Sequence, residues 1–483
     1  MLWVALELPA LPLQIAERAG ASGEALVISE GPSQRPTVAC ANQAAKHAGI
    51  REGQAVAAAK VLAADLRILE RDPQAEREAL ERLAAWAGQF TPMVSVESQG
   101  IVLEVSSTLR LFQGHAHLTS VILHGFKELG FQASLGVAPT PLAARLIARA
   151  ESRGLQVRSC LELQDLQARL ADLPLFLFDW PETTLARLTD LGLLRVKDVL
   201  AIPNEGLARR FGPEMVMSLE RLLGRIADPR LPFAPSPTFR SRIELPAEAD
   251  GVGALLFPLR RLLLEFEGYA RGRGAGAQQL GLTLEHGRKA RTRFSLDFAS
   301  PEREADFILS IAREKLGRLQ LTAATLALTL RAEALMPYAP RTAAWLPGAQ
   351  EQKVERDRLV QRLVARLGRD RVFGIALADD HRPERNWKAA AKGVRTSECS
   401  KPAGRRPMWL LQRPQRLITA EGQPLLQGAL DFVAGPERIE AGWWDGDEVS
   451  RDYYVASNPH GETYWVFREH RDPDAWYVHG VFS

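Results

Sequence analysis

The amino-acid sequence predicts an α+β protein built from several domains, and three observations support this prediction. The chain has 483 residues, enough for about three or four domains of ~100–200 residues each. Short strand-like segments alternate with longer helix-like segments over much of its length. A Pro-rich stretch at 229–239 and an aromatic-rich tail at 409–483 interrupt this alternation. With 46% hydrophobic and 25% charged residues, the chain can form sizeable cores.

Residues 1–165 predict a mixed unit of strands and helices. The strand-like segments are short apolar runs, and the helix-like segments carry apolar residues at helical spacing. The expected strands are Leu2–Leu8, Ala25–Ser29, Thr37–Ala41, Met93–Val96, Ile101–Val105 and Gln132–Val137. The expected helices are Arg77–Gly88, His117–Gly130 and Pro141–Ala150.

Residues 166–232 predict an all-helical unit, because short helix-like segments alternate there with Gly and Pro. The stretch PRLPFAPSPTF that follows predicts an extended, semi-rigid linker. Beyond it the mixed pattern returns. The expected elements are a helix at Val252–Tyr269, strands at Gln279–Glu285 and Arg291–Asp297, a helix at Pro301–Leu319 and a strand at Ala323–Ala332.

The last part of the chain predicts a polar connection followed by a small β domain. Residues 336–408 are polar and irregular around one charged helix-like segment, Glu351–Leu367. The tail repeats aromatic, strand-like runs such as DYYV, YWVF and WYVHGVFS.

Charge, cysteines and hydropathy exclude several classes of protein. The net charge is +3, from 61 basic and 58 acidic residues, so the total argues neither for nor against nucleic acid. Cys40, Cys160 and Cys399 are far apart and odd in number, which fits neither a disulfide framework nor a metal-ligand set. No apolar run approaches the ~20 residues of a membrane span, and the N-terminus lacks a basic signal-peptide region. We therefore expect a cytoplasmic protein without a membrane segment.

The segment LGLLRV at 191–196 predicts a helix, a tight turn at Gly192 and a second helix. In such a helix–hairpin–helix, backbone N–H groups at the turn can bind a phosphate, and Arg195 and Lys197 add positive charge. The alternative is a plain pair of helices with cations on the surface, and the pattern alone does not choose between them.

A second basic region is a candidate nucleic-acid interface. The segment RKARTRFSL places cations at alternating positions, which share one face of a strand. Such a face suits a sugar-phosphate backbone, and the alternative is a solvated strand surface. The candidate residues are Arg271, Arg273, Arg288, Lys289, Arg291 and Arg293.

Three segments resemble motifs of the Y-family DNA polymerases. PTVACANQAAKHAGIREGQAV (36–56) is similar to the fingers segment, TPMVSVESQGIVLEV (91–105) to the palm strand pair, and SLGVAPTPLAARLIA (134–148) to a third motif of the family. The resemblance implies the right-hand architecture of a Y-family polymerase, with palm, fingers, helix–hairpin–helix thumb and little finger, and a C-terminal extension with a small β-rich domain. It assigns 1–10 and 76–165 to the palm, 11–75 to the fingers, 166–232 to the helix–hairpin–helix thumb, 233–239 to a linker, 240–335 to the little finger, 336–408 to a second linker and 409–483 to a C-terminal domain.

The same resemblance indicates that the catalytic set is degraded. Active members hold two Mg²⁺ ions with grouped carboxylates, and the matching positions here are Ala5, Glu7, Glu97 and Ser98. Two carboxylates are lost and two are longer by one methylene group. The resemblance therefore implies a non-enzymatic homologue without a metal or cofactor. The alternative is an active translesion polymerase that binds Mg²⁺ through Glu7 and Glu97, with Glu104 as a further ligand.

The positions that would contact an incoming nucleotide are also changed. Gln43 stands at the family's Tyr position and Lys46 at its Arg position. In the third motif Thr140 and Pro141 replace Asn and Lys, whereas Arg145 keeps a cation. The resemblance implies that Gln43, Lys46 and Arg145 are remnants of a nucleotide site.

The tail and the segment RPMWLLQRPQRL (406–417) resemble a non-catalytic branch of the family. That branch implies a scaffold in DNA-damage tolerance and induced mutagenesis, which binds primer–template DNA and the sliding clamp. The implied protein partners are an error-prone C-family DNA polymerase and a RecA-related accessory protein. A third hypothesis, a duplex-binding repair factor without polymerase ancestry, also remains open.

Two segments are candidates for partner binding. The clamp candidate is PRTAAWLPG, with Arg341, Ala344, Trp345 and Leu346. Its alternative is a linker whose Trp packs on its own domain. In the tail, the partner-binding candidates are Trp443, Trp444, Tyr453, Tyr454 and Trp465, and the alternative is that these aromatic residues form the core of a small β domain.

Overall fold

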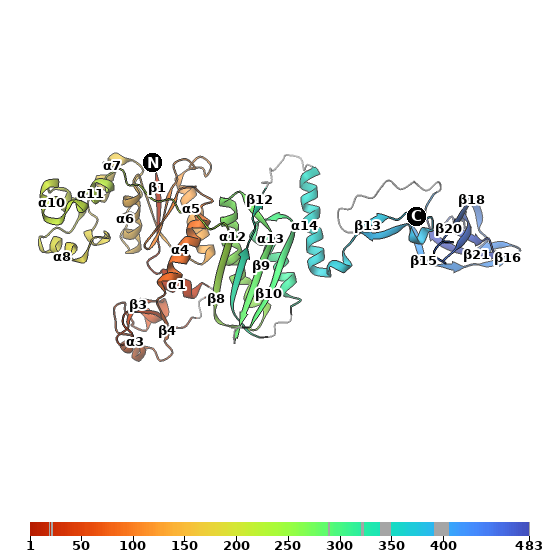
Figure 1. Ribbon diagram of the computed structural model, residues 1–483, viewed down its shortest axis with the longest axis horizontal. Helices are drawn as coiled ribbons and strands as arrows, with labels where there is room; N and C mark the ends of the chain where they lie inside the picture. Colours follow the sequence, from red (N-terminus) through yellow and green to blue (C-terminus); the bar gives the residue numbers. More distant parts are fainter. Residues whose placement is uncertain are drawn as a thin grey trace. The chain divides into compact units, whose positions relative to one another are not determined.

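A computed structural model describes residues 1–18, 20, 23–287, 290–319, 323–338, 349–390 and 405–482. The chain divides into two compact units, Met1–Arg366 and Leu367–Ser483 (Figure 1). Among the described residues, no helix combines the length and the apolar character that a membrane crossing requires.

The first unit begins with an antiparallel sheet, here called the palm sheet, in the order β5-β6-β1-β7. Its strands are β1 (Trp3–Glu7), β5 (Val94–Glu97), β6 (Gly100–Glu104) and β7 (Ser134–Ala138). Helices α4 (Pro73–Ala87) and α5 (His115–Leu129) cover one face, and α6 (Pro141–Ser152) covers the other (Figure 1). Side chains alternate along β1, so Val4 and Leu6 pack with α4 and α5, whereas Ala5 packs on the α6 side. Glu7 shares that second face.

A small fingers-like subdomain follows β1. It contains α1 (Leu11–Glu17), β2 (Leu26–Glu30), β3 (Thr37–Ala41), α2 (Gln43–His47), α3 (Val56–Leu62) and β4 (Arg67–Glu70). The strand order is β3-β2-β4, with β2 parallel to β4. The Asn42 side chain accepts a hydrogen bond from Ala45 N and so caps α2.

Residues 163–222 are helical, as the Gly and Pro spacing predicted. They form α7 (Leu163–Leu170), η1 (Leu175–Leu177), α8 (Glu182–Asp190), α9 (Val196–Leu200), α10 (Asn204–Phe211) and α11 (Pro213–Leu222). Gly192 lies in the turn between α8 and α9 with φ 76°, a left-handed conformation that glycine adopts without strain.

A second antiparallel sheet, here called the arginine sheet, has the order β10-β9-β11-β8. Its strands are β8 (Phe239–Ala249), β9 (Ala275–His286), β10 (Arg291–Glu302) and β11 (Thr325–Ala332), and β12 (Met336–Pro337) pairs with β9. Helices α12 (Val252–Gly272) and α13 (Ala305–Leu316) pack on its apolar face. The sequence analysis did not predict β8. Because β8 begins at Phe239 and β12 ends at Pro337, the sheet is slightly longer at both ends than the predicted domain at 240–335.

Helix α14 (Ala349–Leu367) was predicted as one charged helix. Its Arg358 donates hydrogen bonds to Glu302 and Glu304 at 2.6 and 3.0 Å. These contacts attach α14 to the arginine sheet domain.

The second unit is β-rich. Its main sheet has the order β15-β21-β20-β19-β18. The strands are β15 (Trp409–Arg416), β18 (Asp431–Ala441), β19 (Val449–Ser457), β20 (Thr463–Glu469) and β21 (Asp472–Val481), with a hairpin of β16 (Ile418–Ala420) and β17 (Gln423–Leu425). Before this sheet come η3 (Arg369–Arg371), β13 (Gly374–Leu377), η4 (Pro383–Arg385) and β14 (Trp387–Ala390).

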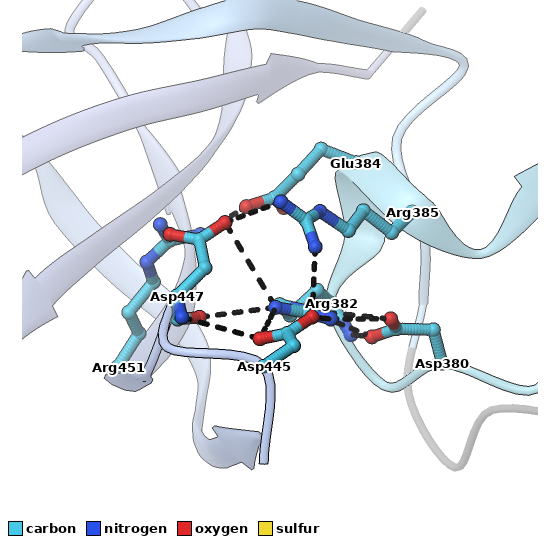
Figure 2. Close-up of polar contacts among 7 residues, drawn as sticks. All are labelled: Asp380, Arg382, Glu384, Arg385, Asp445, Asp447 and Arg451. Carbon is cyan, nitrogen blue, oxygen red and sulfur yellow. Dashed lines mark hydrogen bonds and ion pairs between the residues drawn. The ribbon is translucent and has the colours of Figure 1, made fainter. Parts of the chain in front are cut away.

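An ion-pair cluster explains why part of the expected linker belongs to the second unit. Figure 2 shows Arg382 between Asp380 and Asp445, with Arg385 and Asp447 beside them. Arg382 is buried and donates to Asp380 at 2.8 Å and to Asp445 at 2.6 Å. Since Asp445 lies in the loop between β18 and β19, the cluster fastens the segment around η4 to the sheet.

Candidate functional site

Glu7 ends β1 and is 2% exposed. Its Oε1 atom lies 3.3 Å from Nε of Arg145 and 3.2 Å from Nε of Arg149. Both arginines come from α6, where a spacing of four residues places them on one side of the helix. A buried carboxylate requires such partners, because desolvation of an unpaired charge is costly.

Glu97 ends β5 and contacts the same guanidinium from another direction. Its Oε2 atom lies 2.9 Å from Nη1 of Arg145, and its Oε1 atom lies 3.0 Å from Nη1 of Arg230. Arg145 therefore joins the two carboxylates that the family resemblance placed at metal positions.

The network extends into the helical subdomain and the linker. Asp179 lies 3.2 Å from Arg145 and 2.6 Å from Arg149, and Asp228 lies 2.7 Å from Arg230. Four carboxylates thus face three guanidinium groups, so the formal net charge of the network is −1. The sequence had singled out Glu7, Glu97 and Arg145, and the structure adds Arg149, Asp179, Asp228 and Arg230. We call these seven residues the arginine-filled site.

The pKa values agree with a charged network. Burial raises the pKa of Asp179, but the hydrogen bonds and charges of Arg149 and Arg145 outweigh it and hold this pKa below its ordinary value. Burial likewise lowers the pKa of Arg149, but Asp179 and Glu7 outweigh it and raise this pKa above its ordinary value.

The arginine-filled site does not suit Mg²⁺. Mg²⁺ requires an octahedron of oxygen ligands, and here guanidinium groups occupy both oxygens of Glu97 and of Asp179. Ala5 is fully buried and offers no oxygen from its side chain, and Ser98 is exposed in the turn after β5. Within the described ranges, no three His, Cys, Asp or Glu residues are placed to hold a metal ion.

The nucleotide-site candidates lie in two places. Gln43 and Lys46 are exposed on α2, where Gln43 is 3.4 Å from His47 and Lys46 is 3.6 Å from Glu52. In the part of the chain that the structure describes, no hydrogen bond or ion pair joins them to Arg145, which is paired with carboxylates.

The predicted helix–hairpin–helix forms, but its polar groups have internal partners. The Asp198 carboxylate accepts hydrogen bonds from Leu194 N and Arg195 N at 3.0 and 2.9 Å. Arg195 and Lys197 lie 2.9 and 2.8 Å from Asp172. Hydrogen bonds from Lys197 and Arg195 lower the pKa of Asp172. A phosphate that binds here must compete with Asp172 for these cations.

The exposed side of the arginine sheet collects arginines from three of its strands, β8, β10 and β11. In one row Arg293 pairs with Thr283, Thr283 with Thr329, and Thr329 with Arg242. In the next row Ser295, Gly281, Arg331 and Arg240 are neighbours. The members of this arginine face are Arg240, Arg242, Arg291, Arg293 and Arg331, and a groove of about 550 Å³ runs beside Arg293 and Arg331.

Sequence reasoning found Arg291 and Arg293 but missed the other members. In FRSRIEL, arginines alternate with other residues, and this pattern could have identified Arg240 and Arg242 as sharing one face of a strand. Arg331 had no such signal, because its strand TLALTLRA contains no second cation. Arg242 is 2.9 Å from Glu285. Among the described residues, Arg240, Arg293 and Arg331 have no ion pair with a carboxylate.

The other basic candidates lie elsewhere. Arg271 pairs with Glu267 one turn earlier in α12. Arg273 donates to the carbonyl oxygens of Pro235 and Ser236 at 2.7 and 2.8 Å, so it holds the Pro-rich segment. Arg288 and Lys289 lie outside the described residues, as do the clamp candidates Arg341, Ala344, Trp345 and Leu346.

The five aromatic candidates of the tail separate into core and surface. Tyr453 and Trp465 are each 1% exposed and stack at 4.0 Å, and the Tyr453 hydroxyl lies 2.8 Å from His479 Nδ1. Tyr454 is half-buried. Trp443 and Trp444 are 77% and 54% exposed in the loop between β18 and β19.

Comparisons with known proteins agree with the sequence motifs. Residues 13–149 match the impB/mucB/samB family, a segment that contains Glu97 and Arg145. The chain is 29% identical over 473 residues to Protein ImuB of Caulobacter vibrioides (strain NA1000 / CB15N), covering 90% of this chain and 100% of that protein. It is 27% identical over 207 residues to DNA polymerase IV of Shewanella sp. (strain ANA-3), covering 42% of this chain and 56% of that protein.

Among solved structures, DinB from Sulfolobus solfataricus is 16% identical in sequence, with a TM-score of 0.40. The match covers 70% of this chain and all of that one.

Proposed function

We propose that the chain, which is similar to Protein ImuB and in part to the impB/mucB/samB family, descends from a Y-family DNA polymerase and acts as a non-catalytic scaffold in translesion DNA synthesis and damage-induced mutagenesis. Its activity would lie in binding DNA and other proteins in the cytoplasm rather than in nucleotidyl transfer.

The arginine-filled site is the observation that carries this proposal. Phosphoryl transfer by two metals needs carboxylates that hold two Mg²⁺ ions and neutralise the developing charge. In this chain Arg145 lies where it neutralises Glu7 and Glu97 from within the protein. A metal ion would have to displace a guanidinium that is 8% exposed and held by three carboxylates.

Primer extension tests the proposal against the active alternative. Purified protein should bind primer–template DNA and extend no primer with Mg²⁺ or with Mn²⁺. Templated extension that disappears in Glu7→Ala and in Glu97→Ala would establish that the longer carboxylates still assemble a catalytic centre. A contaminating polymerase would be recognised because neither substitution would change its activity.

The arginine face supports the DNA-binding part of the proposal. Arg240, Arg293 and Arg331 are exposed on one face of the sheet, on β8, β10 and β11, and none of them forms an ion pair with a carboxylate of the described residues. Cations at strand spacing suit the phosphates of a nucleic acid backbone. Primer–template DNA is therefore the first proposed partner.

The proposed protein partners are the sliding clamp, an error-prone C-family DNA polymerase and an ImuA-like, RecA-related protein. Clamp binding is assigned to Arg341, Ala344, Trp345 and Leu346, so Trp345→Ala with Leu346→Ala should abolish capture of the clamp. Unchanged capture by this variant would refute the assignment, and its DNA affinity provides the control.

Trp443 and Trp444 are the better candidates for docking a protein partner, because large exposed aromatic side chains anchor interfaces. We expect Trp443→Ala with Trp444→Ala to weaken binding of the C-family polymerase or the RecA-related protein while thermal unfolding stays unchanged. Tyr453→Phe, in the core, is the matched control. Equal binding by the double variant and the wild type would exclude this loop.

A further inference from the structure

One side of α14 carries a row of exposed leucines, here called the leucine stripe. Leu359, Leu363 and Leu367 follow one another at intervals of four residues, so they lie on the same side of the helix. Their exposed fractions are 56%, 38% and 52%. The row is about 12 Å long at a rise of ~1.5 Å per residue. Contiguous apolar side chains that remain open to water commonly mark a binding surface.

Another side of α14 is already in contact with the arginine sheet domain. Arg358 donates hydrogen bonds to Glu302 and Glu304, and its guanidinium lies 4.4 Å from the ring centre of Phe307. Ala365, two turns further along the helix, packs against the core of the arginine sheet. These contacts decide which side of α14 meets its own domain, and the leucine stripe is on a different side.

Arginines accompany the leucine stripe. Arg356, Arg362 and Arg366 are exposed, and steps of three or four residues from the leucines place them on the same side of α14. Among the exposed residues between 355 and 367, only Glu355 is acidic. This side of the helix therefore has a formal charge of +2, and it attracts an acidic surface.

An apolar row with a basic border fits a protein partner better than a membrane, DNA or a second copy of the chain. Helices that lie on membranes commonly carry Trp or Phe on their apolar side, and α14 contains no aromatic residue. The phosphates of DNA would gain nothing from three leucines. If two copies packed on their leucine stripes, arginines would lie beside arginines, and like charges repel.

A scaffold that holds three proteins at once needs three separate surfaces. The segment at 341–346 is assigned to the clamp, and the loop with Trp443 and Trp444 to one further partner. Neither assignment uses α14, which lies between them in the sequence. A helix with large apolar residues one turn apart is suited to insert into a groove of another protein.

We propose that the leucine stripe, with Arg362 and Arg366, inserts into an apolar groove rimmed by carboxylates, on a protein partner other than the clamp and other than the partner of the Trp443 loop. The leucines supply apolar contact area, and the arginines favour an acidic rim and oppose a basic one. This inference rests on the proposed scaffold function, because it assigns a surface to the remaining partner.

Binding of purified proteins to the full chain tests the proposal. The probes are the C-family polymerase, the RecA-related protein and the sliding clamp, each measured alone by biolayer interferometry. Leu359→Gln with Leu363→Gln should weaken binding of the polymerase or of the RecA-related protein by about ten-fold or more. Binding of the clamp and of DNA should stay unchanged. Glutamine preserves helix propensity, and circular dichroism checks the fold.

A matched control removes exposed apolar side chains from other helices. Val61 on α3 and Leu123 on α5 are 85% and 38% exposed. Val61→Gln with Leu123→Gln should leave the binding of all three probes unchanged. An equal loss of binding in this control and in the leucine variant would refute the assignment to α14.

The outcomes separate the docking surface from the function on which it rests. Equal affinity of the leucine variant and the wild type for every probe would refute the leucine stripe and leave the scaffold function intact. Loss of the same probe in Trp443→Ala with Trp444→Ala would also refute it, because the two surfaces would then serve one partner. If the wild type binds neither the polymerase nor the RecA-related protein, the scaffold function fails, and the inference fails with it.

Arg366→Glu provides a second test that leaves the leucines in place. It should slow association of the same probe and flatten the salt dependence of binding, because salt screens the attraction between Arg366 and an acidic rim. An unchanged salt dependence would contradict the acidic rim. If the leucine variant fails to fold, this single variant decides.

Two further measurements address the other occupants. Wild-type binding to vesicles that contain phosphatidylserine, lost in the leucine variant, would overturn the proposal in favour of a membrane. A wild-type dimer in light scattering that becomes a monomer in the leucine variant would overturn it in favour of a second copy. We expect neither result.

Discussion

At the scale of single residues, Arg145 supplies the positive charge that balances the carboxylates of the arginine-filled site. Its guanidinium is fixed on α6 and reaches Glu7, Glu97 and Asp179 at 2.9–3.3 Å. A guanidinium carries one positive charge and donates in a plane, so it can balance carboxylates but cannot act as a Lewis acid for a phosphoryl oxygen. Glu7 and Glu97, which the family resemblance places at metal positions, are thereby paired within the protein.

Arg145→Met should destabilise the first unit by ~3 kcal/mol, because it leaves Glu7 and Glu97 short of positive charge in a buried site. This loss of stability is at the lower end of the range for breaking a buried ion pair, since Arg149 still pairs with Glu7 and Arg230 with Glu97. Urea unfolding measures it. Arg195→Met, which breaks an exposed pair with Asp172, is the control and should cost less than ~1 kcal/mol. Equal losses in the two variants would contradict the structural role of Arg145.

Asp445 makes the stability of the second unit depend on pH. The hydrogen bond from Arg382 lowers the pKa of Asp445 to about 2, against the opposing effect of burial. The unfolded chain has a pKa of ~3.9, so this contribution is fully present above that pH and is lost as pH falls through about 2. In this pH window the free energy of unfolding of Asp445→Asn should therefore fall less steeply with decreasing pH than that of the wild type. Identical profiles would disprove the contribution.

At the scale of helices and strands, periodicity predicted most of the palm sheet and the arginine sheet. It missed β8, whose first residues FRSR follow a Pro-rich run and are half polar. It also missed β4 and the short helices α1, α2 and α3. Such short elements depend on tertiary packing more than on their own pattern.

The site was harder to predict than the fold, because its contacts join residues far apart in sequence. Glu7 and Arg145 are separated by 138 positions, and no local pattern links Arg230 to Glu97. The spacing of Arg145 and Arg149 on one side of α6 was visible, but its target was not. Likewise, only strand register brings Arg331 beside Arg240.

The arginine face predicts a change in the salt dependence of DNA binding. Arg293→Ala with Arg331→Ala should weaken binding to any sequence and reduce the slope of log K against log salt by about 2, one for each lost phosphate contact. Anisotropy titrations at several salt concentrations measure this slope. Arg356→Ala, an exposed cation on α14, should leave it unchanged. An unaltered slope in the double variant would place DNA elsewhere.

At the hairpin between α8 and α9, we expect a substitution to strengthen DNA binding rather than weaken it. Asp172→Ala removes the carboxylate that pairs with Arg195 and Lys197, so both cations become available to phosphate. DNA affinity should rise, and the rise should disappear when Lys197→Ala is added. An affinity that does not respond to Asp172→Ala would indicate that this hairpin does not contact DNA.

At the scale of the whole molecule, the arginine-filled site and the surfaces proposed to bind partners occupy different places. The first unit contains the arginine-filled site and the arginine face. The second contains the exposed Trp443 and Trp444, in the loop whose Asp445 pairs with Arg382. The proposed scaffold would need these surfaces rather than a reactive centre, and the arginine-filled site contributes to neither of them.

Binding of Mn²⁺ tests most directly whether arginines have replaced the metals. Electron paramagnetic resonance would count bound Mn²⁺ in the wild type, Glu7→Gln and Glu97→Gln. We expect the same weak, non-specific binding in all three proteins, because guanidinium groups already occupy the carboxylates. A specific Mn²⁺ site in the wild type that is lost in both variants would contradict this account and favour an active polymerase.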